Sequence, residues 1–348
     1  MSEKEAELWD SVKKSDFIVE QLHLLTQECR EAGIPIEDVR HYWYKSNKFS
    51  IFARNKIKGY EEVRDIIVSD MEGHAPEYPK IERSPVTSPH LLVIDPSDIH
   101  IGKLAVASET GEDYNISKAI ERVNEGILQI LCYAAGFEID KILFVIGNDA
   151  LHIDHPHRTT TAGTPQDTDG MWHEAFLAAK RMYINAIERL LSVADVHVVY
   201  NPSNHDYMSG FFLADTVSSW FHKCENVTFD ASIRHRKYYQ YGTNMIETDH
   251  GDGCKPKDTP ILMAHEMPEM WASSKHRYSY KHHLHHTIKQ GSIVGMGGDE
   301  IGVNIEFLRT PTATDGYHYK QGYVSMKSMQ GFVHCLEQGR LASFSHNY

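Results

Sequence analysis

Five polar clusters in the sequence each follow a short apolar run, and their residue types are those that bind metal ions. In chain order they lie in LLVIDPSDIH, LFVIGNDALH, VVYNPSNHD, MIETDHGD and YSYKHHLHH. The chain has 23 histidines, most of them after residue 100 and often beside Asp or Asn. Imidazole nitrogens with carboxylate and amide oxygens suit hard or borderline divalent metals. A single histidine at a strand end more often caps a loop, so only the five clusters together indicate a site.

The elements that must position these clusters alternate between strand and helix. Apolar runs and helical stretches follow one another at residues 91–95, 115–136, 141–147, 170–193, 196–201 and 209–222. This alternation predicts α/β layers around a central sheet. Ligand sites of open α/β sheets lie outside the carboxyl ends of the strands, so we expect the clusters to converge. Runs at 243–250, 260–265 and 290–297 predict later strands of a second sheet or an antiparallel extension.

A proline-rich stretch at residues 73–90 divides the chain into two unlike parts. We interpret it as a linker. Residues 1–72 predict a small, mainly helical accessory module, with helices at 4–32 and 60–71 and a short strand at 49–54. Residues 91–348 form the domain that carries the polar clusters. Within it, residues 302–348 are expected to be closing strands of the second sheet.

Composition narrows the class of protein. The chain has 348 residues, a net charge of −13, 41% hydrophobic and 24% charged residues, which is typical of a globular protein. An acidic chain is not expected to coat nucleic acid or anionic membranes. No apolar run is long enough for a spanning helix, and the charged N-terminus is unlike a signal peptide, so we expect a cytoplasmic protein. The five scattered cysteines form no CxxC pair and predict neither disulfides nor a thiolate zinc site.

The five clusters resemble the signature of the calcineurin-like metallophosphoesterases, which runs D-x-H, G-D, G-N-H-D, H and G-H-x-H. The matching residues are Asp98 and His100, then Gly147-Asn148-Asp149, then Asn204-His205-Asp206, then His250, and last His283 and His285. The resemblance covers residues 91–290 and implies a four-layer αββα sandwich of the α/β class. Three positions depart from the signature: Asn148 is inserted in the second motif, and Ser203 and His282 replace glycines. Those glycines would matter if the positions required a positive φ.

In this family the motif residues form two metal sites that share one carboxylate. Carried over, the first site would consist of Asp98, His100, Asp149 and His285, and the second of Asp149, Asn204, His250 and His283. Two cations about 3.5–4 Å apart would leave positions open for water and phosphate. The resemblance implies a hydroxide shared by both metals as the nucleophile. We expect Mn²⁺, with Fe²⁺ or Zn²⁺ as alternatives, because the set contains Asp, Asn and His without Cys.

Three more residues of these motifs have predicted roles next to the metals. His205 would orient the phosphate or protonate the leaving oxygen, with Asp206 or a backbone group fixing its tautomer. His152 falls three residues after Asp149, a spacing that resembles SbcCD-type DNA repair nucleases, in which such a histidine assists phosphodiester cleavage. His152 has an alternative interpretation as a support for a metal ligand.

Other segments bear on the substrate. Residues 40–64 carry a net charge of +5 interleaved with aromatic residues, which suits nucleic-acid binding or, equally, a small core with a solvated face. The insertion at 155–170 is expected to be a loop over the site, where Arg158 could contact phosphate. In the segment KHRYSYK, Lys275, Arg277 and Lys281 are expected near the site, and Tyr278 and Tyr280 could stack on a base or merely pack.

The sequence therefore predicts a dinuclear-metal phosphodiesterase, with an exonuclease-like DNA nuclease favoured. The chain also resembles a group of phage-encoded calcineurin-like phosphoesterases described as candidate nucleases, a resemblance that is unspecific about substrate and implies a bacterial host cytoplasm. Nucleic acid, with DNA favoured, is the expected partner. One alternative is a small-molecule enzyme of the same fold, a cyclic-nucleotide phosphodiesterase or a phosphomonoesterase. A second is a scaffold that keeps the fold without chemistry. Homodimerisation is common among such relatives, but the sequence displays no interface.

Overall fold

The computed structural model describes residues 41–45, 50–54, 76–283, 297–322 and 325–348, with five helical residues between 23 and 30. The chain divides into two compact units, Met1–His74 and Ala75–Tyr348. Apart from those five residues, the helices predicted at 4–32 and 60–71 lie outside the described residues. The strand predicted at 290–297 also lies outside them, except for its last residue.

In the first unit, β1 (His41–Lys45) and β2 (Ser50–Arg54) form an antiparallel hairpin in which Trp43 is opposite Phe52. The short strand predicted at 49–54 is therefore confirmed. The side chains of this hairpin lie outside the described residues. Nucleic-acid binding by residues 40–64 stays a prediction.

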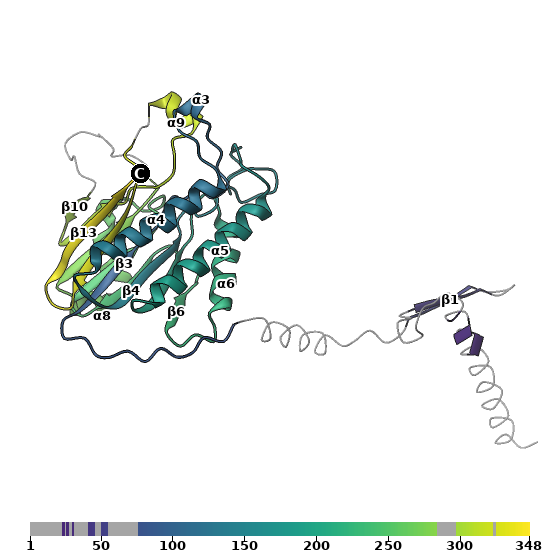
Figure 1. The fold of residues 1–348 in the computed structure, drawn as a ribbon, viewed down its shortest axis with the longest axis horizontal. Helices are drawn as coiled ribbons and strands as arrows, with labels where there is room; N and C mark the ends of the chain where they lie inside the picture. Colours follow the sequence, from purple (N-terminus) through teal and green to yellow (C-terminus); the bar gives the residue numbers. More distant parts are fainter. Residues whose placement is uncertain are drawn as a thin grey trace, which may run out of the picture. The chain divides into compact units, whose positions relative to one another are not determined.

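Six strands form the first sheet of the second unit (Figure 1). In spatial order they are β13 (Gly339–Asn347), β12 (Ser328–Cys335), β3 (Pro89–Ile94), β4 (Glu138–Gly147), β5 (Asp195–Asn201) and β6 (Val227–Asp230). Strands β3 to β6 run parallel, whereas β12 and β13 are antiparallel to their neighbours. The central parallel strands are buried on both faces, as in Leu91–Ile94, which explains their unbroken apolar runs.

Three long helices cover one face of this sheet (Figure 1): α4 (Ile116–Ala134), α5 (Trp172–Leu191) and α6 (Tyr207–Trp220). The short helix α3 (Ala107–Thr110) precedes them. Helix α4 begins at a capping residue, Asn115, whose side chain accepts a hydrogen bond from the Lys118 amide at 2.8 Å. Its buried positions Val123, Ile127 and Ile130 recur every three or four residues and pack into the helix–sheet core.

The second sheet has the order β10-β11-β9-β8-β7. Its strands are β7 (Lys237–Tyr241), β8 (Asn244–Thr248), β9 (His276–Lys281), β10 (Gly297–Glu300) and β11 (Val303–Phe307). One face packs on the first sheet through residues such as Ile246 and Tyr280. The other contributes Met245 and Ile305 to a small core with Met263 of helix α7 (Thr259–Glu266) and with α8 (Pro268–Ser273). The four layers are α, β, β and α, which confirms the predicted sandwich.

Two predictions about the chain after residue 250 were wrong. Residues 260–265 form helix α7 instead of a strand. An apolar run of six residues does not distinguish helix from strand, and Pro260 in the first turn favours a helix start. Residues 302–348 do not all close the second sheet: only β11 belongs to it, while β12 and β13 extend the first sheet. Helix α9 (Gly316–Gln321) lies between β11 and β12 in the chain.

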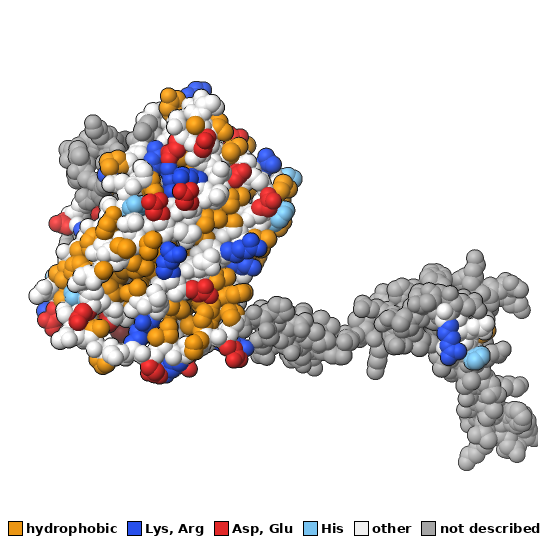
Figure 2. All heavy atoms as spheres, in the orientation of Figure 1, with side chains coloured by type: hydrophobic (Ala, Val, Ile, Leu, Met, Phe, Trp, Pro, Cys, Tyr) orange, Lys and Arg blue, Asp and Glu red, His pale blue; other side chains and the backbone are white. Residues whose placement is uncertain are grey.

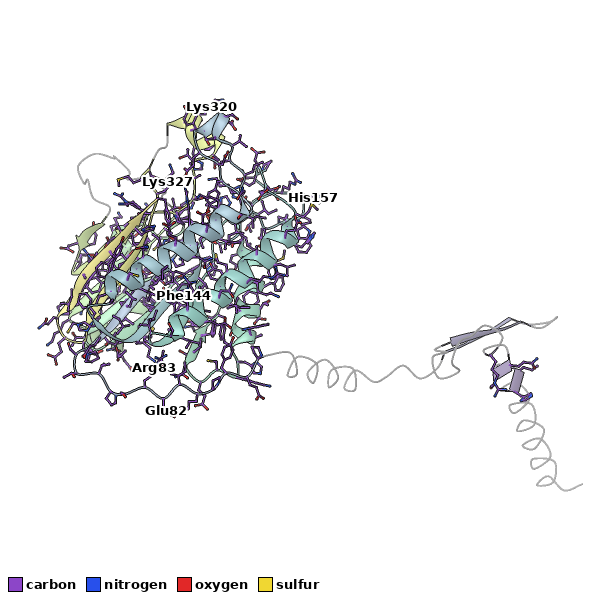
Figure 3. All side chains as sticks on the ribbon, viewed as in Figure 1. Glu82, Arg83, Phe144, His157, Lys320 and Lys327 are labelled. Atoms are coloured by element: carbon purple, nitrogen blue, oxygen red, sulfur yellow. The ribbon has the colours of Figure 1, made fainter. Side chains whose placement is uncertain are left out.

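The described part of the predicted linker, residues 76–90, belongs to the second unit, and its last two residues begin β3. The Ile81 amide donates to Asn226 Oδ1 at 2.8 Å, and the Arg83 guanidinium bonds Asp195 at 2.8 Å and the Leu191 carbonyl at 2.6 Å. Figure 3 shows Arg83 at the end of the sandwich opposite to Lys320 of α9. This segment is therefore held along the amino ends of the parallel strands, away from the polar clusters.

Candidate metal centre

The loops after β3 and β4 continue the pairing of their strands and carry the first predicted ligands. The Asp98 amide donates to the Asn148 carbonyl at 2.7 Å, and the His100 amide donates to the Asp149 carbonyl at 2.9 Å. All four residues have a positive φ, between 48° and 59°. Such φ values are costly for residues other than glycine and cluster at functional sites. The backbone conformation thus directs the side chains of the loops after β3 and β4 toward the same region.

Gly147, immediately before this turn, has a φ of 88°, and a Cβ there would overlap the carbonyl oxygen of Asn201 at the end of β5. The Asn148 amide donates to that same carbonyl at 3.0 Å. The Asn201 side chain in turn exchanges hydrogen bonds of 2.8 Å with Thr248 at the end of β8. Because of these contacts, the ends of β4 and β5 and of the second sheet are fixed together.

The predicted ligands that the structure describes come together at this edge. Asp98, His100 and Asp149 offer ligand atoms within 4.8 Å of one another, and Asp149, His250 and His283 do the same. The first group contains three of the ligands predicted for the first metal and the second group three of those predicted for the second, and His285 lies outside the described residues. Asn204, predicted for the second site, places its Oδ1 2.9 Å from His250 Nε2. Both groups could hold a metal ion, and Asp149 belongs to both.

Asp149 has the surroundings of a bridging ligand. It is fully buried, and its Oδ1 accepts a hydrogen bond from the His205 amide at 3.0 Å. Its Oδ2 has no aligned hydrogen-bond donor among the described residues and lies 3.4 Å from His250 Nε2 and 3.9 Å from His100 Nε2. A buried carboxylate oxygen facing two imidazoles is costly without a cation. The donor set therefore fits a pair of divalent metals.

The charges of these groups support one another. Burial opposes ionisation of Asp149, but His250 and His205 hold the pKa of this carboxyl below its usual range. Burial would lower the pKa of His250, yet the Asp149 carboxylate raises it to about 9. Burial raises the pKa of Asp98 to about 6. Without a metal, the His250 imidazolium thus offsets part of the negative charge of Asp98 and Asp149, and a divalent metal bound at His250 would take the place of its proton.

His205 is placed as predicted for a group that contacts phosphate. Its ring centroid lies 4.6 Å from that of His100, and it lines the cavity described below. Its Nδ1 lies 3.0 Å from the carbonyl oxygen of His152, so a backbone group fixes the tautomer. The alternative role for Asp206 was wrong. Its buried carboxylate accepts hydrogen bonds from Ser203 at 2.5 Å and from the Leu151 amide at 2.8 Å.

His152 is buried, with its Nδ1 3.4 Å from the Nδ1 of His100. Burial and neighbouring cations lower its pKa well below the usual range, so the ring is neutral at pH 7. His100, His152 and His205 also form a group with ligand atoms within 4.8 Å. His152 therefore contacts a predicted metal ligand and also lines the cavity beside His205, and both of its predicted roles stay predictions.

The two glycine replacements are accommodated, since neither Ser203 nor His282 has a positive φ. Both side chains, which glycine would lack, form hydrogen bonds. Ser203 Oγ donates to Asp206 and accepts from the Asp149 amide at 2.8 Å. His282 Nε2 lies 3.1 Å from Asp95 Oδ2 and so connects the end of β9 to the end of β3. These two replacements therefore add hydrogen bonds around the centre.

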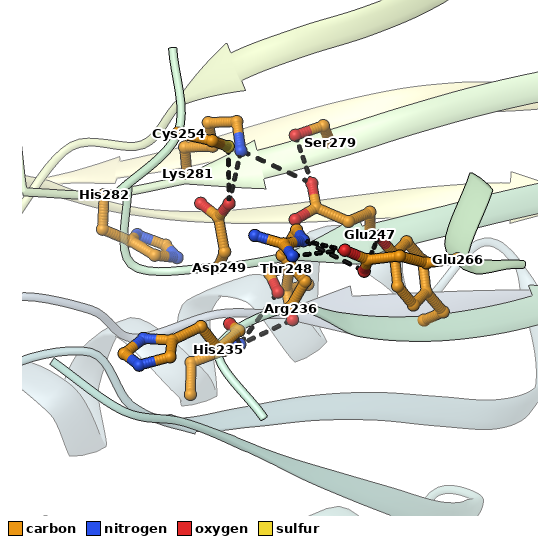
Figure 4. Close-up of polar contacts among 12 residues, drawn as sticks. His235, Arg236, Glu247, Thr248, Asp249, Cys254, Glu266, Ser279, Lys281 and His282 are labelled. Carbon is orange, nitrogen blue, oxygen red and sulfur yellow. Dashed lines mark hydrogen bonds and ion pairs between the residues drawn. The ribbon is translucent and has the colours of Figure 1, made fainter. Parts of the chain in front are cut away.

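Next to His250 in the chain begins a buried ion cluster, and Figure 4 shows its members Lys281, Asp249 and Glu247. Lys281 is fully buried, 2.6 Å from Asp249 Oδ2 and 3.6 Å from Glu247 Oε2. Ser279 Oγ donates to Glu247 at 2.5 Å. Because Asp249 precedes His250 and Lys281 lies two residues before His283, this ion pair ties together the strand ends that carry both histidines.

Two cavities border the centre. One, of about 620 Å³, is lined by His100, Asp149, His205 and His283, by residues 164–167 of the predicted loop, and by 315–318. The other, of about 740 Å³, is lined by His250 and by Arg234, His235 and Arg236. Figure 3 shows His157, in the loop, and Lys320, on α9, toward the same end of the molecule.

Several residues predicted near the site serve packing instead. Tyr280 is fully buried and stacks on Phe332 with ring centroids 4.3 Å apart. The Tyr278 hydroxyl accepts a hydrogen bond from the Arg340 amide at 2.8 Å. The Arg277 guanidinium lies 4.0 Å from the Trp271 ring centroid and bonds two carbonyls. Strand β9 is half-buried at its beginning and fully buried from Ser279 to Lys281, so its side chains pack inside the sandwich, which the sequence motif did not reveal.

Comparisons with known proteins add little to this picture. No family model matches the chain, and no curated protein matches it. Among solved structures the chain is similar to Vps29 of Chaetomium thermophilum, at 10% identity, over 74% of this chain and 97% of that chain, with a TM-score of 0.30. Similarity at this level says nothing about activity, which must be inferred from the site's own residues. No helix in the described part of the chain is long and apolar enough to cross a membrane.

Proposed function

We propose that this protein hydrolyses phosphate esters at a dinuclear metal centre and that its substrate is a polynucleotide, with DNA favoured. The observation that supports the chemistry best is Asp149, a fully buried carboxylate common to two groups of metal-ligand atoms. Two metals, when bound, would supply an activated water and positive charge for the phosphate. The family that the motifs resemble, the calcineurin-like metallophosphoesterases, uses such a centre.

The chain's own residues have distinct tasks in this proposal. Asp98, His100, Asp149, Asn204, His250, His283 and His285 would hold the metals. The Nδ1–H of His205 donates to the His152 carbonyl, which leaves Nε2 as the ring atom available to substrate, and the ring borders the cavity. With protons on both ring nitrogens, His205 would donate a hydrogen bond from Nε2 to a phosphate oxygen or to the leaving oxygen. The strained backbone at residues 98–100 and 148–149 would keep the ligands in place before substrate binds.

A polynucleotide is favoured because the centre lies between two cavities, and the second one adds arginines. Arg234 and His235 border His250, and the His235 ring stacks with Tyr207 at a centroid distance of 5.9 Å. The Arg236 guanidinium in the same lining is bound by Glu266, and Asp249 and Asp252 also line the cavity, so Arg234 and His235 are the groups that would contact phosphate. Cations and aromatic rings beside a metal centre suit a chain of phosphates and bases. By contrast, Figure 2 shows acidic and basic side chains interspersed over the face that carries α4 and α5. A polyanion would therefore be held near the centre and not across that face.

A small-molecule phosphoesterase is the second candidate, and one observation favours it. The cavity beside His205 is walled by residues 164–167 and 315–318, which would enclose a compact ligand such as a nucleotide. The same centre would perform the chemistry in both cases.

The test is cleavage of end-labelled linear single- and double-stranded DNA in Mn²⁺, with the wild type, His205→Ala and His222→Ala. His222 is exposed at the end of α6 and serves as the matched control. We expect shortening of the DNA by the wild type and by His222→Ala, and its loss in His205→Ala. Intact DNA together with turnover of a cyclic nucleotide or a phosphomonoester would establish the second candidate.

Measurements of metal binding and of turnover on the same preparations distinguish the enzyme proposal from a non-catalytic scaffold. Asp149→Asn should abolish turnover of every ester and reduce the number of Mn²⁺ ions bound, as counted by isothermal titration calorimetry. A wild type that binds no Mn²⁺ and hydrolyses none of these substrates would refute the enzyme proposal.

A further inference from the structure

Helix α9 forms a wall of the cavity that faces the candidate metal centre. Asp315, Gly316, Tyr317 and His318 line the same cavity as His205. The sequence assigned these residues no role, because nothing near them resembles a known motif. Their position opposite the ligands makes them candidates for substrate contact.

A chain of buried charges holds this wall in place. Lys103 is almost fully buried, and its Nζ lies 2.9 Å from Asp315 Oδ2. The other oxygen, Asp315 Oδ1, accepts a hydrogen bond from the His318 amide at 2.8 Å and lies 2.7 Å from His318 Nδ1. Lys103 also donates its amide to the His100 carbonyl at 2.9 Å. One carboxylate thus connects the segment that carries a metal ligand to the imidazole on α9.

The aromatic residues of α9 differ in where they lie. Tyr317 and Tyr319 are both exposed, at 66% and 55%, but of the two only Tyr317 lines the cavity. The Tyr317 ring stands edge-on to His318, with centroids 5.5 Å apart. An exposed ring beside a metal centre provides a face on which a nucleobase can stack.

We propose that α9 recognises the nucleotide unit next to the scissile phosphate, with Tyr317 stacking on its base and His318 bonding its sugar-phosphate. Asp315 is a positioning residue that acts through His318, and Lys103 balances its charge so that the wall does not repel phosphate. The inference deepens the proposed function and depends on it, since it assigns the substrate class of the same centre.

The test uses two substrates that differ only in their bases: a single-stranded oligothymidylate and an abasic oligomer with the same sugar-phosphate backbone. Tyr317→Ala should lower kcat/KM on oligothymidylate about tenfold and leave the abasic oligomer unchanged. Tyr319→Ala, on the same helix, is the matched control and should match the wild type. His318→Ala should raise KM for both oligomers, and adding Asp315→Asn to it should cause no further rise.

Binding supplies a second measurement without turnover. In the His205→Ala background with Mn²⁺, fluorescence anisotropy of labelled oligothymidylate should show weaker binding after Tyr317→Ala and unchanged binding after Tyr319→Ala. Equal effects of Tyr317→Ala on both oligomers, or none on either, would overturn base stacking by α9 while the nuclease proposal stands. A wild type that cleaves neither oligomer would refute the proposed function itself.

Discussion

Replacement of Lys281 by Met should be one of the most destabilising single changes in the second unit. The side chain is fully buried, and it neutralises Asp249 at 2.6 Å while also facing Glu247 at 3.6 Å. Methionine fills a similar volume but leaves the Asp249 carboxylate buried without its cation. Breaking a buried pair on one side costs about 3–5 kcal/mol. In a unit of this size that corresponds to a fall in Tm on the order of 10 °C.

The assay is thermal unfolding followed by circular dichroism at pH 7 in a chelator, so that metal binding does not contribute. The matched control is the double variant Lys281→Met with Asp249→Asn, which removes both charges and should recover much of the lost Tm. A single variant within about 1 °C of the wild type would refute the reasoning. So would a double variant that is no more stable than the single one, because the loss would then come from packing and not from the unpaired charge.

Three further changes test the frame of the site. Burial raises the pKa of Glu247 to about 8 from its ordinary 4.5, so the folded state retains a proton that the unfolded state releases. Stability should therefore fall as pH rises from 4.5 to 8, and Glu247→Gln should flatten this decline in urea midpoints. Ser203→Gly removes the hydrogen bonds to Asp149 and Asp206 and should cost about 2 kcal/mol by urea unfolding. Gly147→Ala should reduce the yield of folded protein and Mn²⁺ binding in calorimetry, because its Cβ would overlap a backbone carbonyl.

The centre was predictable because its ligands are local in sequence. Each described ligand follows a strand by a few residues. Parallel strands bring the residues at their carboxyl ends to one edge of the sheet, independently of the conformation of the connecting loops. The apolar runs of β3, β4 and β5 were equally visible, since strands covered on both faces carry unbroken apolar residues. The order of the motifs therefore predicted which side chains would meet.

The other wall of the cavity was not predictable in the same way. Lys103 and Asp315 are far apart in the chain and meet only because α9 folds back over the loop after β3. The short spacing between Asp315 and His318 was the only local signal, and a carboxylate three residues before a histidine is common on helices. Helix α7 was mistaken for a strand because its burial involves tertiary contacts that override a six-residue pattern.

The position of β12 has a consequence for how the protein must be made. This strand pairs with β3, yet it follows β3 by more than two hundred residues in the chain. During synthesis, every ligand-bearing loop emerges while one edge of β3 is still unpaired, and an exposed apolar edge invites association with other chains. A ribosome that stops before residue 328 would release a chain that has all the ligands of the centre and an open sheet. Premature termination should therefore yield aggregates and not a shortened, folded protein.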